Sequence, residues 1–223
     1  EAVFGQGGPA HVGGGTIDIV TLDEVYWAAP PERYEAGSPN VVGAVALGAS
    51  IRKLRSVGME HIAAHEKYLT SYALQRMEVL DGLTLYGPTG AGRLDDRLGV
   101  LPFTIEGVPH GKVAAILSVE GAIGVRSGCF CAHPYVLHLL GIGGSAYESY
   151  KQDVLEGDRS KLPGLVRVSF GCYNTVEEID WLMEMLQRVI DGEYQGRYQL
   201  EPASGEYFPV GFDSSIVEDW FAL

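Results

Sequence analysis

The segment that most constrains the fold of this chain lies toward its C-terminal end. Leu165–Phe170 (LVRVSF) is an apolar, strand-like run, and residues 176–190 repeat apolar side chains at the 3.6-residue period of a helix. Thr175 stands three residues before Glu178, which is the spacing of a capping box at a helix start. A strand followed by a helix with one apolar face predicts a helix packed on a sheet.

Further elements are predicted on the N-terminal side of this segment. After about residue 80, short strands alternate with helices in a mixed order, which predicts an α+β domain. The earlier part supplies one strand and two helices, too little for a domain, so we expect it to be the end of a larger α/β domain. The expected strands are 16–20, 83–86, 98–105, 123–126 and 165–170, and the expected helices are 41–57, 59–80, 112–119, 134–140 and 176–190.

Two stretches fit neither pattern. Residues 145–163 read as a polar insertion, and residues 193–223 are rich in Gly, Pro and aromatic side chains without a period. We expect the second stretch to wrap over a surface, and both are candidates to cover a site entrance or to bind a partner. The chain also opens on a Gly-rich loop without an initiator Met, so we expect it to be part of a longer protein.

The charge balance narrows the classes of function. The 223 residues carry 16 Lys and Arg against 29 Asp and Glu, a formal charge of −13 at pH 7. This excess of acid repels phosphate backbones and anionic lipids, so binding to nucleic acid or to a membrane surface is disfavoured. No apolar run approaches the roughly 20 residues of a membrane helix. Three Cys in a chain of this length are no disulfide framework and favour a cytoplasmic location.

The densest cluster of reactive residues is VRSGCFCAHPY at Val125–Tyr135, for which three readings stay open. Cys129, Cys131 and His133 would form a metal site, although zinc usually takes two well-separated pairs of ligands. A cysteine on a turn after a strand would be a nucleophile. Cysteines also serve as small buried apolar side chains. From the residues alone, burial is favoured for Cys129 and Cys172, and the nucleophile is favoured for Cys131.

Arg167 is the second notable residue, because it lies in the middle of an apolar strand. Its neighbours Val166 and Val168 point to the opposite face. The planar guanidinium suits a carboxylate, which it can hold with two parallel hydrogen bonds. A salt bridge to one of the chain's own acids, or exposure on an open sheet face, would also explain it. Taken by itself, the strand favours these last two explanations.

The remaining signals are weaker. The stretch GPTGAG at Gly87–Gly92 lacks the Lys-Ser/Thr of a phosphate loop and reads as a connection. The histidines show no partner spacing, and we read them as surface residues or as residues that support a site from behind: His11, His61, His65, His110 and His138.

Several of these segments, taken in order, resemble one family. GGG at Gly13–Gly15, PERYEAGSPN at Pro31–Asn40 and GMEHI at Gly58–Ile62 are followed by LTLYGP, VRSGCFCAHP and VRVSFGCYNTVEEID. The series covers roughly residues 10–191 and resembles the class V aminotransferase family, in particular its cysteine desulfurase and selenocysteine lyase branch. The resemblance implies the fold type I architecture of pyridoxal phosphate (PLP) enzymes.

The same resemblance divides the chain into three parts. Residues 1–57 would be the end of the large cofactor domain with a linking helix, residues 58–192 the small C-terminal domain, and residues 193–223 a tail that wraps over the surface. The complete enzyme would be a homodimer, because the family's cofactor phosphate contacts residues of both subunits.

Roles for individual residues are carried over by position in the motifs. Cys131 stands where desulfurases place the thiol that takes sulfur from L-cysteine as a persulfide, for delivery to a sulfur-acceptor protein. Arg167 stands where the family binds the substrate carboxylate, and Arg126 lies at the loop that presents the thiol. Gly37 and Ser38 stand where backbone and hydroxyl contact the cofactor phosphate. No residue is assigned to a metal.

The sequence also departs from the family pattern. The family's cofactor lysine lies upstream of this chain, so the polypeptide alone is expected to be inactive. The thiol loop reads Gly-Cys-Phe-Cys where common desulfurases have Gly-His-His-Cys, a form that also resembles the desulfurase domain of molybdenum-cofactor sulfurases. The alternatives are a class V transaminase, epimerase or other lyase without thiol chemistry, or a non-catalytic partner or regulatory domain.

Overall fold

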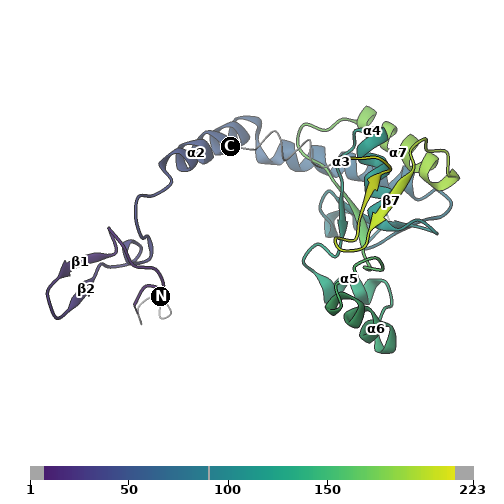
Figure 1. Cartoon of the computed structure of the whole chain (residues 1–223). Helices are drawn as coiled ribbons and strands as arrows, with labels where there is room; N and C mark the ends of the chain where they lie inside the picture. Colours follow the sequence, from purple (N-terminus) through teal and green to yellow (C-terminus); the bar gives the residue numbers. More distant parts are fainter. Residues whose placement is uncertain (1–7, 90, 214–223) are drawn as a thin grey trace. The chain divides into compact units, whose positions relative to one another are not determined.

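The computed structural model describes residues 8–89 and 91–213 (Figure 1). The chain forms two units, Glu1–Met59 and Glu60–Leu223. The first seven residues of the Gly-rich opening and the last ten residues of the tail lie outside the described residues. Within the described part, no helix combines the length and the apolar composition needed to cross a membrane.

The first unit consists of a small hairpin and a long helix. Strand β1 (Ile17–Val20) pairs antiparallel with β2 (Val25–Trp27), and a short 3-10 helix, η1 (Glu32–Tyr34), follows. The helix α2 (Val41–Val57) has the predicted bounds, because the Asn40 side chain accepts a hydrogen bond from the Gly43 amide at its start. The three-residue strand β2 was not predicted, since it is too short to show an alternating pattern.

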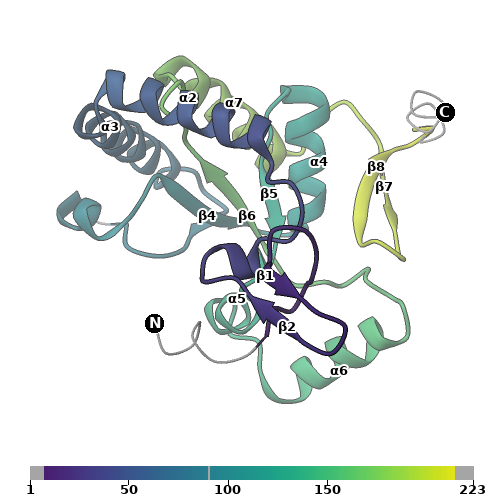
Figure 2. The same cartoon turned by 90° about the vertical axis from the view of Figure 1, so that its left-hand side faces the viewer.

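The second unit is built on a four-stranded antiparallel sheet with the order β3-β4-β6-β5. Three helices cover one face of this sheet (Figure 2). The strands are β3 (Leu83–Leu85), β4 (Val100–Ile105), β5 (Arg126–Gly128) and β6 (Leu165–Ser169). The covering helices are α3 (Met59–Met77), α4 (His110–Gly121) and α7 (Val176–Asp191).

Alternation along the strands decides which side chains enter the core. In β4, Leu101, Phe103 and Ile105 are buried against the helices, as the two-residue period of a strand requires. In β6, Val166 and Val168 join the same core. The residues that alternate with these buried side chains on both strands therefore point to the opposite face of the sheet. The helices α3, α4 and α7 do not cover that face.

The helix α7 begins with the predicted capping box. The Thr175 side chain accepts from the Glu178 amide, and the Glu178 carboxylate accepts from the Thr175 amide at 3.0 Å. Both bonds satisfy amides that the first helical turn leaves without partners. This prediction is confirmed.

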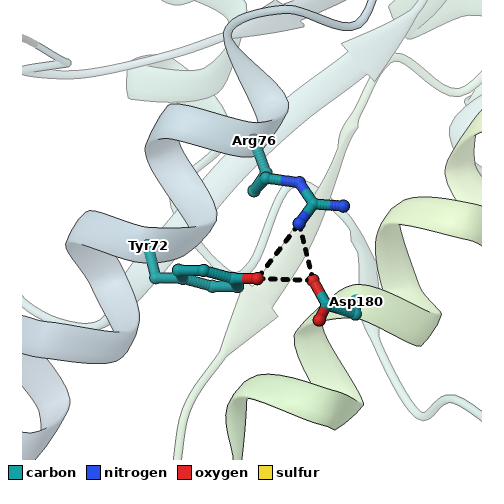
Figure 3. A network of polar contacts seen from close by, with 3 residues as sticks. All are labelled: Tyr72, Arg76 and Asp180. Atoms are coloured by element: carbon teal, nitrogen blue, oxygen red, sulfur yellow. Dashed lines mark hydrogen bonds and ion pairs between the residues drawn. The ribbon is translucent and has the colours of Figure 1, made fainter.

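A polar network joins α3 to α7 beside the core (Figure 3). The Tyr72 hydroxyl donates to Asp180 Oδ1 at 2.7 Å, and Arg76 Nη1 donates to the same oxygen at 2.8 Å. The hydrogen bond to Asp180 raises the pKa of Tyr72. Asp180 ends the longest family-like motif in the sequence, and its contacts give it a structural role in packing two helices.

Two predictions about local structure are wrong. The strand expected at 123–126 is β5, three residues later than predicted at its start, because Ile123 packs on the helical core instead. The insertion at 145–163 holds a helix, α6 (Gly144–Leu155), which lies beside α5 (His133–Leu139) beyond one end of the sheet (Figure 1). No residue of α6 is buried, and most of its side chains are polar, which is why the sequence pattern did not indicate a helix.

The tail forms a second hairpin, of β7 (Tyr198–Glu201) and β8 (Glu206–Pro209), beside α4 (Figure 2). Glu120, near the C-terminal end of α4, binds the segment that leads into this hairpin. Its carboxylate accepts from the Gln195 and Gly196 amides at 2.9 Å each and from the Tyr198 hydroxyl at 2.8 Å. Burial raises the pKa of Glu120, but the hydrogen bonds together outweigh this effect, so the pKa lies below its ordinary value.

Candidate active site

Two arginines stand directly opposite each other on neighbouring strands. The register of β5 and β6 pairs Arg126 with Arg167, and β4 places Pro102 on the other side of Arg167. Opposed residues of an antiparallel pair share one face, with Cβ atoms about 4.5–5.5 Å apart. Both guanidinium groups therefore start from the face of the sheet that the helices leave uncovered.

Neither arginine has an acidic partner among the described residues. The Arg167 Nε is buried and has no hydrogen-bond partner there either. The salt bridge that the isolated strand favoured is therefore not formed by the described residues. Like charges placed directly opposite each other destabilise a sheet, so an anion between Arg126 and Arg167 would relieve a repulsion that the fold itself creates.

The segment after β5 is a tight turn that carries Cys131. The Ala132 amide donates to the Cys129 carbonyl at 2.8 Å, and the two central residues, Phe130 and Cys131, have φ of 52° and 59°. Positive φ at both central positions is the pattern of a type I′ turn, which usually takes Asn and Gly. A left-handed conformation costs about 1–2 kcal/mol for a residue with a side chain. Strained backbone conformations of this kind are frequent at functional sites. In this turn, one of the two strained residues is the exposed Cys131.

Phe130 joins this turn to the arginine pair. Its ring lies with the centroid 5.0 Å from the Arg167 guanidinium carbon, within the range of a cation–π contact. The same side chain packs on a small buried cluster of Cys129, Val136 and Leu165. The thiol-bearing turn and Arg167 are therefore in contact through one residue.

The other two cysteines behave differently from Cys131. Cys129 is 9% exposed, and its thiol donates to the Pro163 carbonyl at 3.2 Å. Burial raises the pKa of the Cys129 thiol, so it stays protonated and serves as a packed side chain, as predicted. Cys172 is exposed, so the prediction that it is buried is wrong. It follows Gly171 in the turn after β6, beyond the residues of the strand whose side chains enter the core.

His110 binds the segment that packs against the strand before the Cys131 turn. The sequence did not distinguish it from the other histidines. Its Nε2 donates to the Leu162 carbonyl at 2.9 Å, because a carbonyl oxygen only accepts. Its Nδ1 is buried with no partner among the described residues. Burial lowers the pKa of His110, and the bond to Leu162 opposes this with a smaller effect. The pairing spans 52 positions, so no local pattern reveals it.

Gly164 allows the chain to pass close beneath β5. A Cβ at this position would lie 2.5 Å from Gly128 Cα and 2.7 Å from His110 Nε2. Because only a glycine fits this gap, the segment 162–164 is pressed against the strand that leads into the Cys131 turn. The bonds from His110 and Cys129 fasten the same segment.

The remaining predicted site residues, Gly37 and Ser38, belong to the first unit. Gly37 has a φ of 81°, and its amide donates to the Gly14 carbonyl at 2.9 Å. Ser38 is exposed and lies two residues before Asn40, the N-cap of α2. The structure thus places Arg126 opposite Arg167 and connects the Cys131 turn to Arg167 through Phe130, while Gly37 and Ser38 are part of a separate unit.

The chain has five lysines, and the four in the second unit are all engaged. Lys67 pairs with Asp95, Lys151 with Glu148 at 3.5 Å and Lys161 with Asp153 at 3.7 Å. Lys112 lies over the Tyr194 ring at 5.0 Å. Across residues 8–89 and 91–213, His, Cys, Asp and Glu side chains do not gather in any group of three that would hold a metal ion.

Comparison with known proteins identifies the family. The profile described as Aminotransferase class-V matches residues 1–182 of the chain. The chain belongs to the aminotransferase class-V family. A probable cysteine desulfurase of Halalkalibacterium halodurans is 36% identical over 180 residues, which are 81% of this chain and 37% of that protein.

Solved structures agree with this assignment. The apo structure of a cysteine desulfurase from Thermococcus onnurineus NA1 matches with a TM-score of 0.69 and 34% identity, over 86% of this chain and 42% of that chain. A mutant of C-DES with glycine covalently linked to its PLP cofactor matches with a TM-score of 0.56 and 18% identity, over 80% of this chain and 37% of that chain, and shares the fold. This class V chain spans about two fifths of the length of these relatives.

The close passage at Gly164 yields a first prediction. Gly164→Ala should lower the free energy of unfolding by about 1–3 kcal/mol, because the added Cβ overlaps the Gly128 backbone. Gly124→Ala is the matched control, since a Cβ there meets nothing within 4 Å. Urea unfolding of both variants measures the difference. Equal stability of the two variants would show that the segment 162–164 is not pressed against β5.

The burial of His110 yields a second prediction, about pH. The folded state holds the pKa of His110 below its ordinary value near 6.5, so the unfolded chain binds a proton at a higher pH than the folded chain does. The stability that neutral His110 provides is complete above about pH 7.5 and is lost as the pH falls through 6.5. Urea unfolding between pH 7.5 and 5.5 should show this loss in the unmodified protein and a smaller one in His110→Gln. His138→Gln, at an exposed position, should keep the full loss.

Proposed function

We propose that the protein containing this chain is a cysteine desulfurase that takes sulfur from L-cysteine onto Cys131. The observation that carries the proposal is the placement of an exposed, strained cysteine turn beside two opposed arginines that lack acidic partners within the described residues. Relatives about one third identical are named as cysteine desulfurases, which supports the same substrate.

The residues of this chain divide the work between binding and sulfur transfer. Arg167 and Arg126 bind the carboxylate of the amino acid, because two guanidinium groups on one face offer several N–H donors to its two oxygens. The Cys131 sulfur attacks the sulfur of the substrate. A new S–S bond forms as the substrate's C–S bond breaks, and the carbon takes a proton, which leaves alanine and a persulfide on Cys131.

PLP fits the chemistry of the first unit. When bound, it supplies the electron sink that cleavage of the C–S bond needs. The exposed Ser38 hydroxyl and the backbone at Gly37 lie just before the start of α2, where helix amides favour a phosphate. We propose that they hold the phosphate of a PLP bound by a second copy in a homodimer. The lysine that anchors PLP is proposed to come from a part of the protein outside this chain, which spans about two fifths of the length of its relatives.

The same proposal assigns the parts of the chain. Residues 1–57 form the end of the cofactor domain, residues 58–192 the small C-terminal domain, and residues 193–223 a tail. The persulfide passes to a sulfur-acceptor protein in the cytoplasm, and this chain alone is inactive.

Replacing Cys131 tests the proposed reaction. In the full-length protein with PLP, Cys131→Ser should lower sulfide release from L-cysteine at least about 100-fold, because the hydroxyl does not accept sulfur. Cys172→Ser, at the other exposed cysteine, should release sulfide at the unmodified rate. Amino-acid conversion that persists in Cys131→Ser would assign a transaminase, epimerase or other lyase. An unmodified protein that neither binds PLP nor converts an amino acid would be a non-catalytic domain.

Replacing Arg167 tests carboxylate binding. Arg167→Lys should raise KM for L-cysteine about 10- to 100-fold, because the ammonium keeps the charge but loses the paired hydrogen bonds. Arg188→Lys is the control, since Arg188 pairs with Glu184 on α7. Steady-state kinetics of both variants give the comparison. A KM unchanged by Arg167→Lys would contradict this role.

A further inference from the structure

Phe130 has no role in the proposed reaction, and common desulfurases have His at its position in the motif. It is the first central residue of the strained turn, with a φ of 52°, and Cys131 follows it directly. Its ring centroid lies 5.0 Å from the guanidinium carbon of Arg167. The Phe130 side chain therefore contacts the proposed carboxylate anchor, Arg167, and the next residue in the chain is the proposed nucleophile, Cys131.

The kind of contact matters for what Arg167 can do. An Asp or Glu partner would occupy the N–H edges of the guanidinium and neutralise its charge. An aromatic ring attracts the cation through its face and takes up none of the N–H donors. Arg167 has no acidic partner among the described residues, and its Nε is buried there without a hydrogen bond. The Phe130 ring is the one cation–π partner of its guanidinium in that part of the chain.

Phe130 is itself held in place. It packs on the buried cluster of Cys129, Val136 and Leu165, which draws on the turn, on α5 and on β6. A ring fixed on this cluster does not follow the guanidinium but sets where the guanidinium lies. The turn is in addition closed by the bond from Ala132 to Cys129, so Phe130 and Cys131 move together.

We propose that Phe130 is a positioning residue that fixes the Arg167 guanidinium against the turn that carries Cys131 and leaves its N–H groups free for a carboxylate. The inference rests on the proposed function and adds a specificity to it. Molecules that carry both a carboxylate and a group reacting with the thiol are favoured over neutral analogues of the same size.

The test compares two alkylating agents at Cys131 in the full-length protein. Iodoacetate and iodoacetamide both form an S–C bond at the thiol with loss of iodide, but only iodoacetate carries a carboxylate. Peptide mass spectrometry follows Cys131 separately from Cys129 and Cys172. The ratio of the two rates reports the anion-binding groups beside the thiol and needs neither PLP nor turnover.

Phe130→Leu should lower the iodoacetate to iodoacetamide ratio about 3- to 30-fold, because it removes the ring face but keeps an apolar side chain on the cluster. Leucine also keeps the cost of the left-handed backbone, whereas glycine would relax it. The separate variant Phe130→Tyr, which keeps an aromatic ring, should show the same ratio as the unmodified protein. In turnover of L-cysteine, Phe130→Leu should raise KM by a similar factor and leave kcat within about 2-fold.

Tyr86→Leu is the matched control. Tyr86 packs on the same cluster, and Pro102 of β4 lies between it and Arg167. No hydrogen bond or cation–π contact joins Tyr86 to Arg167 in the described structure, so the same aromatic-to-leucine change should leave the ratio unaltered. Equal changes in the rates of both reagents in Phe130→Leu would mean that Phe130 only packs the turn, and would overturn the inference. A ratio lowered by Arg167→Lys but not by Phe130→Leu would do the same. A ratio unchanged even by Arg167→Lys would instead remove the carboxylate site, and with it the proposed function.

Discussion

The register between β5 and β6 is the constraint on which the rest of the site depends. It sets Arg126 against Arg167 on the face that the helices leave uncovered. A slip of one residue would turn Arg167 into the apolar core and bring Val166 out, so the buried face of β6 enforces the register. The strand β5 has only three residues, and long-range contacts hold the segment before it. The Trp181 indole, for example, donates to the Gly121 carbonyl at 2.8 Å.

The strained turn depends on support from the segment that leads into β6. Unfavourable backbone conformations persist only where their surroundings determine them. Here Cys129 and His110 each donate to a carbonyl of the segment 162–164, and Gly164 lets that segment pass against β5. A buried thiol, a neutral histidine and a glycine thus act together to hold an exposed Cys131, although none of the three reacts in the proposed mechanism.

The polar insertion lies between the Cys131 turn and the segment 162–164 that supports it. The chain leaves the turn through α5, passes along α6 and returns through the segment 162–164 into the strand that carries Arg167. The polar insertion at residues 145–163 is therefore continuous with the segment that supports the site. The tail is held elsewhere, because its hairpin lies beside α4 and is fastened by Glu120.

The sequence by itself determined the features that arise from neighbouring residues. The bounds of α2, the capping box at Thr175 and the alternation around Arg167 follow from side chains one to four positions apart. The series of motifs from Gly13 to Asp180 is likewise a property of the sequence, and it indicates the family that the profile match identifies. Only the tertiary structure decided that Arg126 opposes Arg167, that Phe130 lies on Arg167 and that His110 stands behind the turn. Those contacts join residues 37 to 52 positions apart, and they form because burial of the core selects one register and one path of the chain, which no local pattern encodes.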